Sequence, residues 1–399
     1  MNKDLFNSTM IRGGAQGTGT RRVALLMDNA FAYNRAVLRG VHEYILERTG
    51  WFVHQGIPES RILPALREWA PDGVITHASD PEFAEGLQAW GGPVVSTTSA
   101  LEHPPYPVVD VDHEEAGRLA ARHFLDHGHR HFAFFGSLET GFSRGRERGF
   151  TETVESRGLA VHACHADHLL GRPRPESWVR SEEEIERWLL KLPRPCGVFV
   201  SNDVSARTVI NAAAQLGMQV PEELSIPSVD NDEFECLFTT PTLSSIEIPG
   251  VQIGRRAAAI LEAMMQDRSS SPEGQLLPPV HVIERQSTDL VATDDPVVRS
   301  AVAFIRARYR NQVSVDDIAE DAGISRRTME RRFRAALDRT VHDELTRQRL
   351  ARARRLLQET DLSVEEVAGR SGFSDQRRLN LVFKQQFEVT PMEFRRSVR

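Results

Sequence analysis

One short pattern near the C-terminus occurs twice, and it constrains the fold of this chain more than any other feature of the sequence. Within residues 314–337, a serine that can cap a helix is followed by a helical segment, by Gly323 and by a second capped helical segment. Residues 363–387 repeat this order, and Gly372 stands 49 residues after Gly323. Two helices joined by a short glycine-containing turn are typical of a helix-turn-helix unit. The sequence therefore predicts two such units in tandem.

Polar residues predict where these helices begin. Ser314 and Ser363 precede the first helix of each unit, and Ser374 and Asp375 are both candidates for the cap of the last one. Between the units, residues 341–360 are predicted to form one helix, which at about 1.5 Å per residue spans about 25–30 Å. A rigid spacer of that length can place two helices about one turn of DNA apart on the same face of a duplex.

Charge is distributed unevenly along the chain. Residues 291–399 hold 22 basic and 17 acidic residues, a net charge of +5. The other 290 residues hold 27 basic and 39 acidic residues, a net charge of −12, which together give the −7 of the whole chain. A basic region beside an acidic body is typical of a nucleic-acid reader attached to another domain, although surface charge also varies by chance. With the tandem motif, this balance predicts double-stranded DNA as a partner.

The last hundred residues, about 297–396, resemble the AraC family of transcription activators. The resemblance rests on the tandem arrangement, on the turn GFSD at 372–375 and on the ending FKQQF-x-VTP-x-x-FR at 383–395. It implies that the second helix of each unit enters a major groove, where arginine suits guanine and where glutamine or asparagine suits adenine. One departure is Glu388, where the family usually has glycine.

The resemblance also implies which side chains meet DNA. Base contacts are expected from Arg327, Glu330 and Arg331 in the first unit. In the second unit they are expected from Gln376, Arg377 and Asn380. Phosphate contacts are expected from Arg332 and Lys384, and Arg326 extends the same basic face.

Upstream of this region, short apolar segments alternate with amphipathic helical ones. Strands are predicted at 23–27, 73–76, 94–97, 108–111, 131–136, 197–201, 224–229, 243–248 and 280–283. Helical patterns fall between them at 34–48, 114–127, 144–157, 181–190 and 206–216. Such alternation is typical of parallel sheets covered by helices, and about 270 residues suffice for two lobes. The predicted order is a disordered leader at 1–20, a two-lobed α/β domain at 21–289, a linker at 290–296 and an all-α domain at 297–399.

No motif in the sequence indicates an enzyme. The glycine-rich stretch at 13–19 precedes the first predicted strand, so it cannot form the dinucleotide-binding turn that follows such a strand. The three cysteines lack metal-binding spacing, and the cluster HGHRH at 127–131 is assigned to a helix C-terminus rather than to a metal. We therefore predict no catalytic residues, no cofactor and no metal. Without an apolar run of membrane-span length or a signal peptide, the sequence also predicts a cytoplasmic protein with no membrane partner.

Polar residues follow several of the predicted strands, at the edge where open parallel sheets bind ligands. Asp28 and Asn29 follow the first strand, Asp203 and Asp230 follow two later ones, and Arg146 opens the helix after another. Any one of the acidic or amide residues could simply cap a helix. Their recurrence at equivalent strand ends favours a ligand site. Carboxylate, amide and guanidinium groups suit vicinal hydroxyls, so we expect a sugar or polyol.

The body of the chain resembles the periplasmic-binding-protein-like sensor domain of LacI-type repressors. The shared sequences are FVSND at 199–203, VDND at 229–232 and the RxRGF run at 146–150. One departure is Ser228, where the pattern usually has glycine. The order of this sensor followed by an AraC-like reader resembles the xylose-operon regulators of bacteria, as do AYNRAVLRGVHEY at 32–44 and PPVHVIERQSTD at 278–289.

That resemblance extends the ligand site. It implies that Arg146, Asp203 and Asp230 contact sugar hydroxyls, and that Tyr33 joins Asp28 and Asn29 in a loop that selects the ligand. It further implies a transcription regulator that senses xylose or a related pentose and controls carbohydrate catabolism. The expected partners are operator or promoter DNA, the sugar, a second copy of the chain in a homodimer, and RNA polymerase.

Two other functions remain open from the residues alone. The α/β domain could be a degenerate dimerisation scaffold without a ligand, in which case Arg146, Asp203 and Asp230 would be replaceable. The chain could also be an enzyme with a DNA-binding tail, although no nucleophile–base pair supports that reading. Activation and repression are not distinguished by the sequence.

Overall fold

The computed structural model describes residues 7–11, 21–48, 50–101, 103–166, 183–267, 272–289, 293, 295–311 and 313–398. The chain forms two compact units. The N-terminal unit contains Met1–Leu125 and His129–Leu290, and the C-terminal unit contains Val291–Arg399 together with the short segment Asp126–Gly128. Of the linker expected at 290–296, positions 290–292 and 294 lie outside the described residues.

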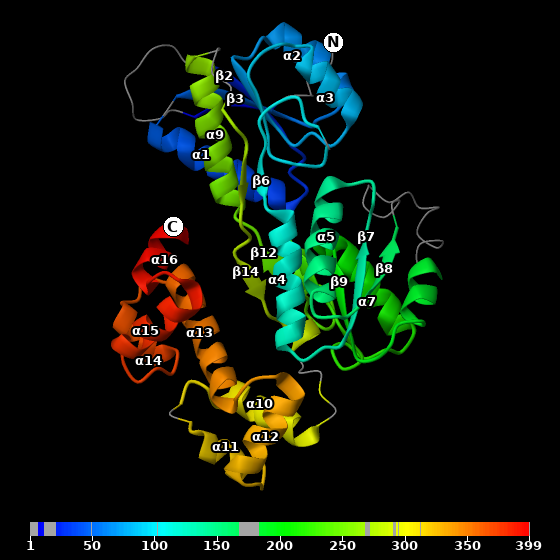
Figure 1. The fold of residues 1–399 in the computed structure, drawn as a ribbon. Coiled ribbons are helices and arrows are strands. Elements are labelled where there is room, and N and C mark those ends of the chain that lie inside the picture. The colour runs from blue at the N-terminus through cyan, green and yellow to red at the C-terminus, as the bar shows by residue number, and fades with distance from the viewer. Residues whose placement is uncertain are drawn as a thin grey trace. The chain divides into compact units, whose positions relative to one another are not determined.

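The first sheet of the N-terminal unit has the strand order β1-β3-β2-β4-β5. Apart from β1 its neighbours pair in parallel, as the alternation of strands and helices predicted. The strands are β1 (Asn7–Ile11), β2 (Arg21–Leu26), β3 (Trp51–Gly56), β4 (Gly73–Thr76) and β5 (Val94–Ser96). Its helices are α1 (Ala32–Arg48), η2 (Ser60–Ile62), α2 (Leu63–Trp69), α3 (Pro81–Gln88) and α9 (Gly250–Gln266). Figure 1 labels β2 and β3 of this sheet and the helices α1, α2, α3 and α9.

The leader differs from its prediction. Instead of being disordered over residues 1–20, the chain forms β1 at Asn7–Ile11, which pairs antiparallel with β3. Residues 1–6 and 12–20 lie outside the described part of the chain. The physical reason is the sheet edge: without β1, β3 would present unpaired backbone N–H and C=O groups along one side. A composition rich in glycine and threonine hid this pairing, because the pairing uses backbone groups rather than side chains.

The second sheet has the strand order β10-β9-β7-β8, with every neighbour parallel. Its strands are β7 (His131–Gly136), β8 (Val161–His165), β9 (Cys196–Val200) and β10 (Leu224–Ser225). The helices beside it are α4 (His113–Asp126), α5 (Gly141–Glu155), a helical stretch at 183–189, α7 (Asp203–Gln215) and α8 (Glu233–Leu237). All five residues of β9 are buried, as expected for a parallel strand covered on both faces.

Two smaller sheets complete this unit. One has the order β11-β12-β14, and the other pairs β13 with β6. Their strands are β6 (Val109–Val111), β11 (Pro227–Val229), β12 (Ser244–Glu247), β13 (Gln275–Leu277) and β14 (His281–Ile283), followed by the short helix η4 (Gln286–Thr288). The single strand predicted at 224–229 is therefore wrong as one element, since β10 and β11 belong to different sheets.

Helices α4 and α5 pack closely because glycines face each other's backbone. A Cβ on Gly117 of α4 would lie 2.1 Å from the carbonyl oxygen of Arg146, and a Cβ on Gly149 of α5 would lie 2.0 Å from that of Glu114. Neither position could hold a side chain without separating the helices. This contact sets the position along α5 of Arg146, the candidate ligand-binding arginine.

The C-terminal unit is all helical and holds two hydrophobic cores. Its helices are α10 (Pro296–Arg308), α11 (Val315–Asp321), α12 (Arg326–Leu337), α13 (Val341–Glu359), α14 (Val364–Arg370), α15 (Gln376–Phe387) and α16 (Pro391–Val398). Helix α13 supplies Val341 and Leu345 to the first core and Leu350 and Leu357 to the second. The predicted spacer helix is thus confirmed, and its 19 residues span about 28 Å.

Local chemistry explains the turns of both helix-turn-helix units. Ser314 and Ser363 form capping boxes at the starts of α11 and α14, and Asp375 rather than Ser374 caps α15. Gly323 and Gly372 have φ angles of +65° and +85°, which glycine adopts without steric cost. The predicted turn residues are therefore confirmed.

Among the described residues, no helix is both long enough and apolar enough to span a membrane.

Candidate ligand site and DNA interface

Arg146 is a buried cation at the centre of the candidate ligand site. It lies in the first half of α5, and only 3% of its surface is exposed. Its guanidinium donates hydrogen bonds to the carbonyl oxygen of Ser201 and, over 3.2 Å, to a carboxylate oxygen of Asp230. The ring of Phe142 stacks on it, with 5.2 Å between the guanidinium carbon and the ring centroid. Its Nε is buried without a partner among the described residues, so one donor remains for a ligand.

Asp203 is the buried anion of the site, at the start of α7. Its carboxylate accepts hydrogen bonds from the hydroxyls of Ser228 and Ser245, the second over 2.6 Å, and from the amide of Asp232 over 2.7 Å. Burial, followed by repulsion from Asp230, raises the pKa of Asp203 to about 7, against the effect of these donors. Burial likewise raises the pKa of Asp230, with Arg146 opposing the shift.

Ser228 explains one departure from the family pattern. Where the pattern usually has glycine, this residue lies fully buried in β11, and its hydroxyl donates to Asp203. A glycine would offer Asp203 no such donor. The serine is therefore a polar support for the buried carboxylate rather than a disruption of the loop.

The chain before α8 has strained backbone at the same place. Asp230 and Asn231 have φ angles of +116° and +51°, a region that non-glycine residues rarely occupy. The side-chain oxygen of Asn231 accepts a hydrogen bond from Arg285 over 2.7 Å, and the backbone N–H of Asn231 donates to the Ser245 hydroxyl over 2.9 Å. These contacts hold the strained segment, which turns the Asp230 carboxylate towards Arg146.

A second polar group was missed by sequence reasoning. Asp110 of β6 is buried and accepts hydrogen bonds from the Tyr33 hydroxyl over 2.8 Å and from the Ser99 amide and hydroxyl, each over 2.8 Å; its contact with Nε2 of His113 measures 3.0 Å. Burial opposes its ionisation, but His113 and these donors hold the pKa of Asp110 well below its usual range. Phe142 contacts both His113 and Arg146, so the two groups adjoin.

The sequence held a weak signal for this group. Asp110 interrupts the apolar strand predicted at 108–111, and a buried carboxylate in a strand needs partners. Burial raises the pKa of Tyr33 well above 10, and burial lowers the pKa of neighbouring His77 to about 4, with the two rings 5.4 Å apart. Tyr33 thus contacts Asp110 and His77 beside the candidate site.

Asp28 and Asn29, the other two loop candidates, lie where the chain turns into α1. The Asp28 side chain accepts a hydrogen bond from the Ala30 amide over 3.0 Å, and the Asn29 side chain is exposed. Arg35 of α1 donates to the Asn29 carbonyl and forms an ion pair with Asp232 at 3.5 Å. The structure brings Tyr33, Arg146, Asp203 and Asp230 together with Asp110 and His113, and it places Asp28 and Asn29 in the adjoining turn.

The candidate DNA-reading surfaces are the outer sides of α12 and α15. Arg327 and Arg331 on α12 are exposed, while Met329 and Phe333 are buried in the core. On α15, Gln376, Arg377 and Lys384 are exposed, Asn380 is half-buried and Leu379 faces the core. An amphipathic helix whose cationic side faces solvent can enter a major groove without rearrangement of the helical domain.

Two of the predicted DNA contacts, Arg332 and Arg326, have protein partners. Arg332 makes two hydrogen bonds of 2.6 Å to Asp295, the cap of α10, and Arg326 forms an ion pair with Asp316 at 3.0 Å. Glu330 is half-buried, with one carboxylate oxygen buried without a partner among the described residues. The Arg332 side chain thus links α12 to the cap of α10.

Comparison with known proteins agrees with this arrangement. A periplasmic binding protein-like domain model matches residues 121–288, and a helix-turn-helix domain model matches residues 318–397. The xylose operon regulatory protein of Escherichia coli strain K12 is 29% identical over 389 residues, covering 95% of this chain and 97% of that protein. The protein of the same name from Haemophilus influenzae is 28% identical over 382 residues, with 94% and 98% covered.

A solved structure extends the comparison to the fold. A xylose-binding transcription activator is 29% identical, covers 95% of this chain and 99% of its own, and superposes with a TM-score of 0.61. The α/β sensor and the tandem helix-turn-helix domain, both predicted from the sequence, are confirmed. The chain is a DNA-binding transcription regulator that joins a periplasmic-binding-protein-like sensor to a helix-turn-helix domain, and it is similar over nearly its whole length to the xylose operon regulatory proteins.

Proposed function

We propose that the N-terminal unit binds a small sugar, xylose or a related pentose, and that the bound sugar controls DNA binding by the C-terminal unit. The observation that carries this proposal is the buried Arg146 with its free Nε beside the carboxylates of Asp203 and Asp230. Donors and acceptors fixed at this spacing suit vicinal hydroxyls. The relatives named for the xylose operon make pentoses the first sugars to test.

The proposed mechanism is a shift between two conformations. Tyr33 comes from α1 beside the first sheet, and Asp110 comes from β6, whose preceding residue Val108 forms a bridge to Ser96 of that sheet. Arg146 and Asp203 instead lie in helices beside the second sheet. A sugar that bonds to both groups favours the conformation in which they adjoin. It changes DNA binding only to the extent that its affinity differs between the conformations.

A calorimetric titration of the full chain tests the sugar. Xylose, arabinose, ribose and glucose are compared, with tryptophan fluorescence as a second readout because Trp51, Trp69 and Trp90 all belong to this unit. We expect one pentose to bind and Asp230→Asn to weaken it by about tenfold or more, the loss of a charged hydrogen bond of about 1.5–3 kcal/mol. Glu152→Gln, an exposed change on the same helix as Arg146, is the matched control. Absence of binding by all four sugars contradicts the proposal.

We propose that α12 and α15 read bases through Arg327, Glu330, Arg331, Gln376, Arg377 and Asn380. Lys384 is proposed at a phosphate, and Arg326 and Arg332 are proposed to support the first surface through their acidic partners. Selection from random duplexes identifies the preferred sequence. Lys384→Ala should weaken all sequences alike and reduce the slope of log affinity against log salt by about 1. Selection of no preferred sequence contradicts the proposal.

We propose that the chain acts as a homodimer through an exposed apolar surface on α8. Phe234 and Phe238 are 61% and 73% exposed, their rings stack with centroids 4.4 Å apart, and Leu237 between them is half exposed. Large exposed aromatic groups are typical of interfaces. Sedimentation of Phe238→Ser should show monomers at concentrations where the natural chain is dimeric. We also propose that the chain is cytoplasmic and contacts RNA polymerase. Binding of purified polymerase to the DNA-bound regulator tests this contact.

We propose binding without catalysis. The Asp203 carboxylate accepts bonds from Ser228, Ser245 and the Asp232 amide, so the protein uses it as a fixed acceptor rather than as a base. Prolonged incubation with the bound pentose, followed by NMR, should return the sugar unchanged. Formation of any product would contradict this part of the proposal.

A further inference from the structure

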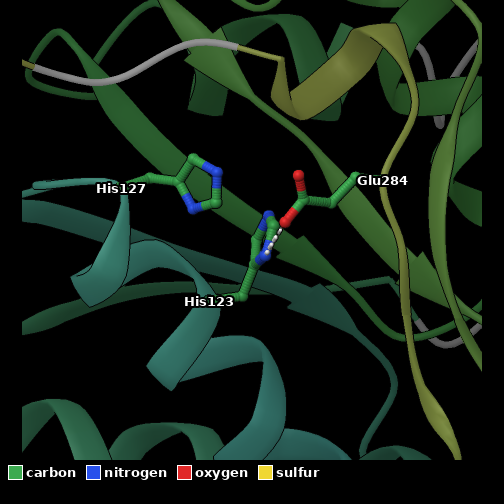
Figure 2. A group of neighbouring side chains, drawn as sticks. All are labelled: His123, His127 and Glu284. Atoms are coloured by element: carbon green, nitrogen blue, oxygen red, sulfur yellow. Dashed lines mark ion pairs between the residues drawn. The ribbon is translucent and has the colours of Figure 1, made fainter. Parts of the chain in front are cut away.

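Two histidines at the end of α4 converge with a glutamate that is distant in sequence (Figure 2). His123 lies in the last turn of α4, and His127 follows four residues later, which places both on one side of the helix axis. Glu284 comes directly after β14. Nδ1 of His123 lies 3.7 Å from a carboxylate oxygen of Glu284, and one ligand atom from each of the three residues lies within 4.8 Å of the others.

The surroundings of this group are those of an enclosed site with one open side. His123 is 6% exposed and His127 is fully buried, whereas 36% of the Glu284 side chain is exposed. Two buried imidazoles offer neutral nitrogen ligands, and the carboxylate supplies a negative charge that offsets part of a cation's charge. The exposed side of Glu284 leaves a path for an ion and for water.

We propose that His123, His127 and Glu284 bind a divalent transition metal ion, with Zn²⁺ as the best match. Two histidines and one carboxylate are a known ligand set for zinc, with bonds of about 2.0–2.2 Å and a fourth position for water. Ligands at those bond lengths lie about 3.3–3.5 Å apart. The three side chains therefore need to close by only about 1–1.5 Å, which small side-chain rotations provide. Ca²⁺ and Mg²⁺ prefer oxygen ligands throughout and fit this group poorly.

The neighbouring histidines show how specific the arrangement is. From the sequence, the whole cluster HGHRH at 127–131 is assigned to a helix C-terminus. In the structure, His129 is buried against the ring of Phe124, with centroids 5.2 Å apart, and His131 is exposed at the start of β7. Of that cluster only His127 joins the group, and its partners His123 and Glu284 lie outside the sequence motif.

The position of Glu284 in the chain determines which segments a bound metal would join. Glu284 precedes η4 (Gln286–Thr288), the last described element of the N-terminal unit before its end at Leu290. A metal held by these residues would cross-link the end of α4 to the segment after β14, two stretches far apart in the sequence, and should therefore stabilise the folded state.

Metal titration of the full chain tests this inference. Chelator-treated protein is titrated with Zn²⁺ against a chromophoric competitor, and with Co²⁺, whose visible absorption reports coordination by nitrogen and oxygen. We expect one equivalent of metal with three protein ligands. Glu284→Gln and His127→Asn should each weaken binding at least tenfold and change the Co²⁺ spectrum. The matched controls are His131→Gln and Glu273→Gln, both at exposed positions.

Thermal unfolding supplies a second readout. Saturating Zn²⁺ should raise the unfolding temperature of the natural chain and of the two controls but not of Glu284→Gln, because a ligand stabilises only the state that binds it. Glu284 is partly exposed, so this variant keeps the test informative if His127→Asn fails to fold. Equal metal binding by Glu284→Gln and by the natural chain overturns the inference. So does the absence of binding in the natural chain.

Discussion

The candidate ligand site and the candidate DNA-reading surfaces handle charge in opposite ways. In the N-terminal unit, Arg146 and Asp203 are buried and bonded to protein groups, so that their geometry is set before a ligand arrives. In the C-terminal unit, Arg327, Arg331 and Arg377 stand exposed on helices whose other sides are buried. Buried charges discriminate because a poor ligand leaves them unpaired. Exposed charges cost nothing before DNA arrives and contribute to binding when they meet phosphate or base.

This difference separates what each substitution should disturb. A change in the buried group should alter the stability of the fold as well as the response to sugar. A change on the exposed surface should alter DNA binding and leave stability nearly unaffected, because isolated surface substitutions usually stay within about 0.5 kcal/mol.

The largest effect is expected from Arg146→Met. Removing the buried guanidinium leaves Asp230, whose side chain is 25% exposed, without its ion-pair partner beside the buried Asp203, at a cost of up to about 5 kcal/mol. Because the pKa of Asp203 is already raised to about 7, the loss should shrink as the pH falls and the carboxyl groups take up protons. Urea unfolding at about pH 8 and about pH 6 measures both effects. If Arg146→Met lowers the free energy of unfolding by less than about 1 kcal/mol at the higher pH, Arg146 is not the buried cation on which the site depends.

The next largest effect concerns a buried carboxylate in the other unit. Glu344 of α13 is fully buried and bonded to Arg339, Arg347 and Gln348. Burial opposes its ionisation, but the arginines lower the pKa of Glu344 from 4.5 to about 2, which corresponds to about 3 kcal/mol. That stability is present above about pH 4.5 and is lost as the pH falls towards 2.

The pH response therefore has opposite signs in the two units. Because the pKa of Asp203 is raised, its contribution to the free energy of unfolding grows as the pH falls from about 7 towards 4. The contribution of Glu344 to the free energy of unfolding is instead lost as the pH falls below about 4.5. Peptide-resolved hydrogen exchange of the full chain separates them. Asp203→Asn should flatten the first response, and Glu344→Gln should abolish the second and destabilise α13 at neutral pH. The exposed change Glu365→Gln should leave both responses intact.

Smaller effects are expected on the DNA-reading surface. Arg327→Ala and Arg377→Ala should each weaken the selected sequence by about 1–3 kcal/mol and relax the preference at one or two base pairs. Arg299→Ala, exposed on α10, serves as the control. Electrophoretic mobility shifts at fixed salt provide the affinities. A uniform loss across all sequences would reassign the residue to phosphate.

The smallest effect on stability is expected at one strained backbone position, Glu388. Glu388 ends α15 with φ of +62°, where the family usually has glycine. Glu388→Gly should raise stability by up to about 1 kcal/mol, because relief of strain outweighs the greater freedom of the unfolded chain. The same exchange at Glu320, inside α11, should lower stability by about 1 kcal/mol. Thermal unfolding of both variants decides, and a loss at both positions would contradict the strained turn.

Features that depend on residues near in sequence could be predicted, whereas features that depend on contacts between distant segments could not. The C-terminal turns depend on caps and glycines within a few residues, so Ser314, Gly323 and Gly372 were identified correctly. The ambiguity at Ser374 was resolved only by the structure, where the Asp375 carboxylate accepts the Arg378 amide over 2.8 Å.

The ligand site depends on contacts between distant segments. Asp203 and Asp230 could be identified from the sequence, because a polar residue directly after an apolar strand is a local signal. Asp110 and His113 were missed because their roles arise from Tyr33, 77 residues away from Asp110 in sequence, and from Phe142. Glu284 and His123 were missed as partners for the same reason: no local pattern links α4 to the residue after β14.

The central claim is that a sugar held by the buried group controls a DNA reader with an exposed surface. It is tested most directly by the affinity of the full chain for its selected DNA with and without saturating pentose. We expect a ratio of about 5–150-fold in one direction for the natural chain and a ratio near 1 for Asp230→Asn. A ratio of 1 in the natural chain, or an unchanged ratio in Asp230→Asn, would contradict it.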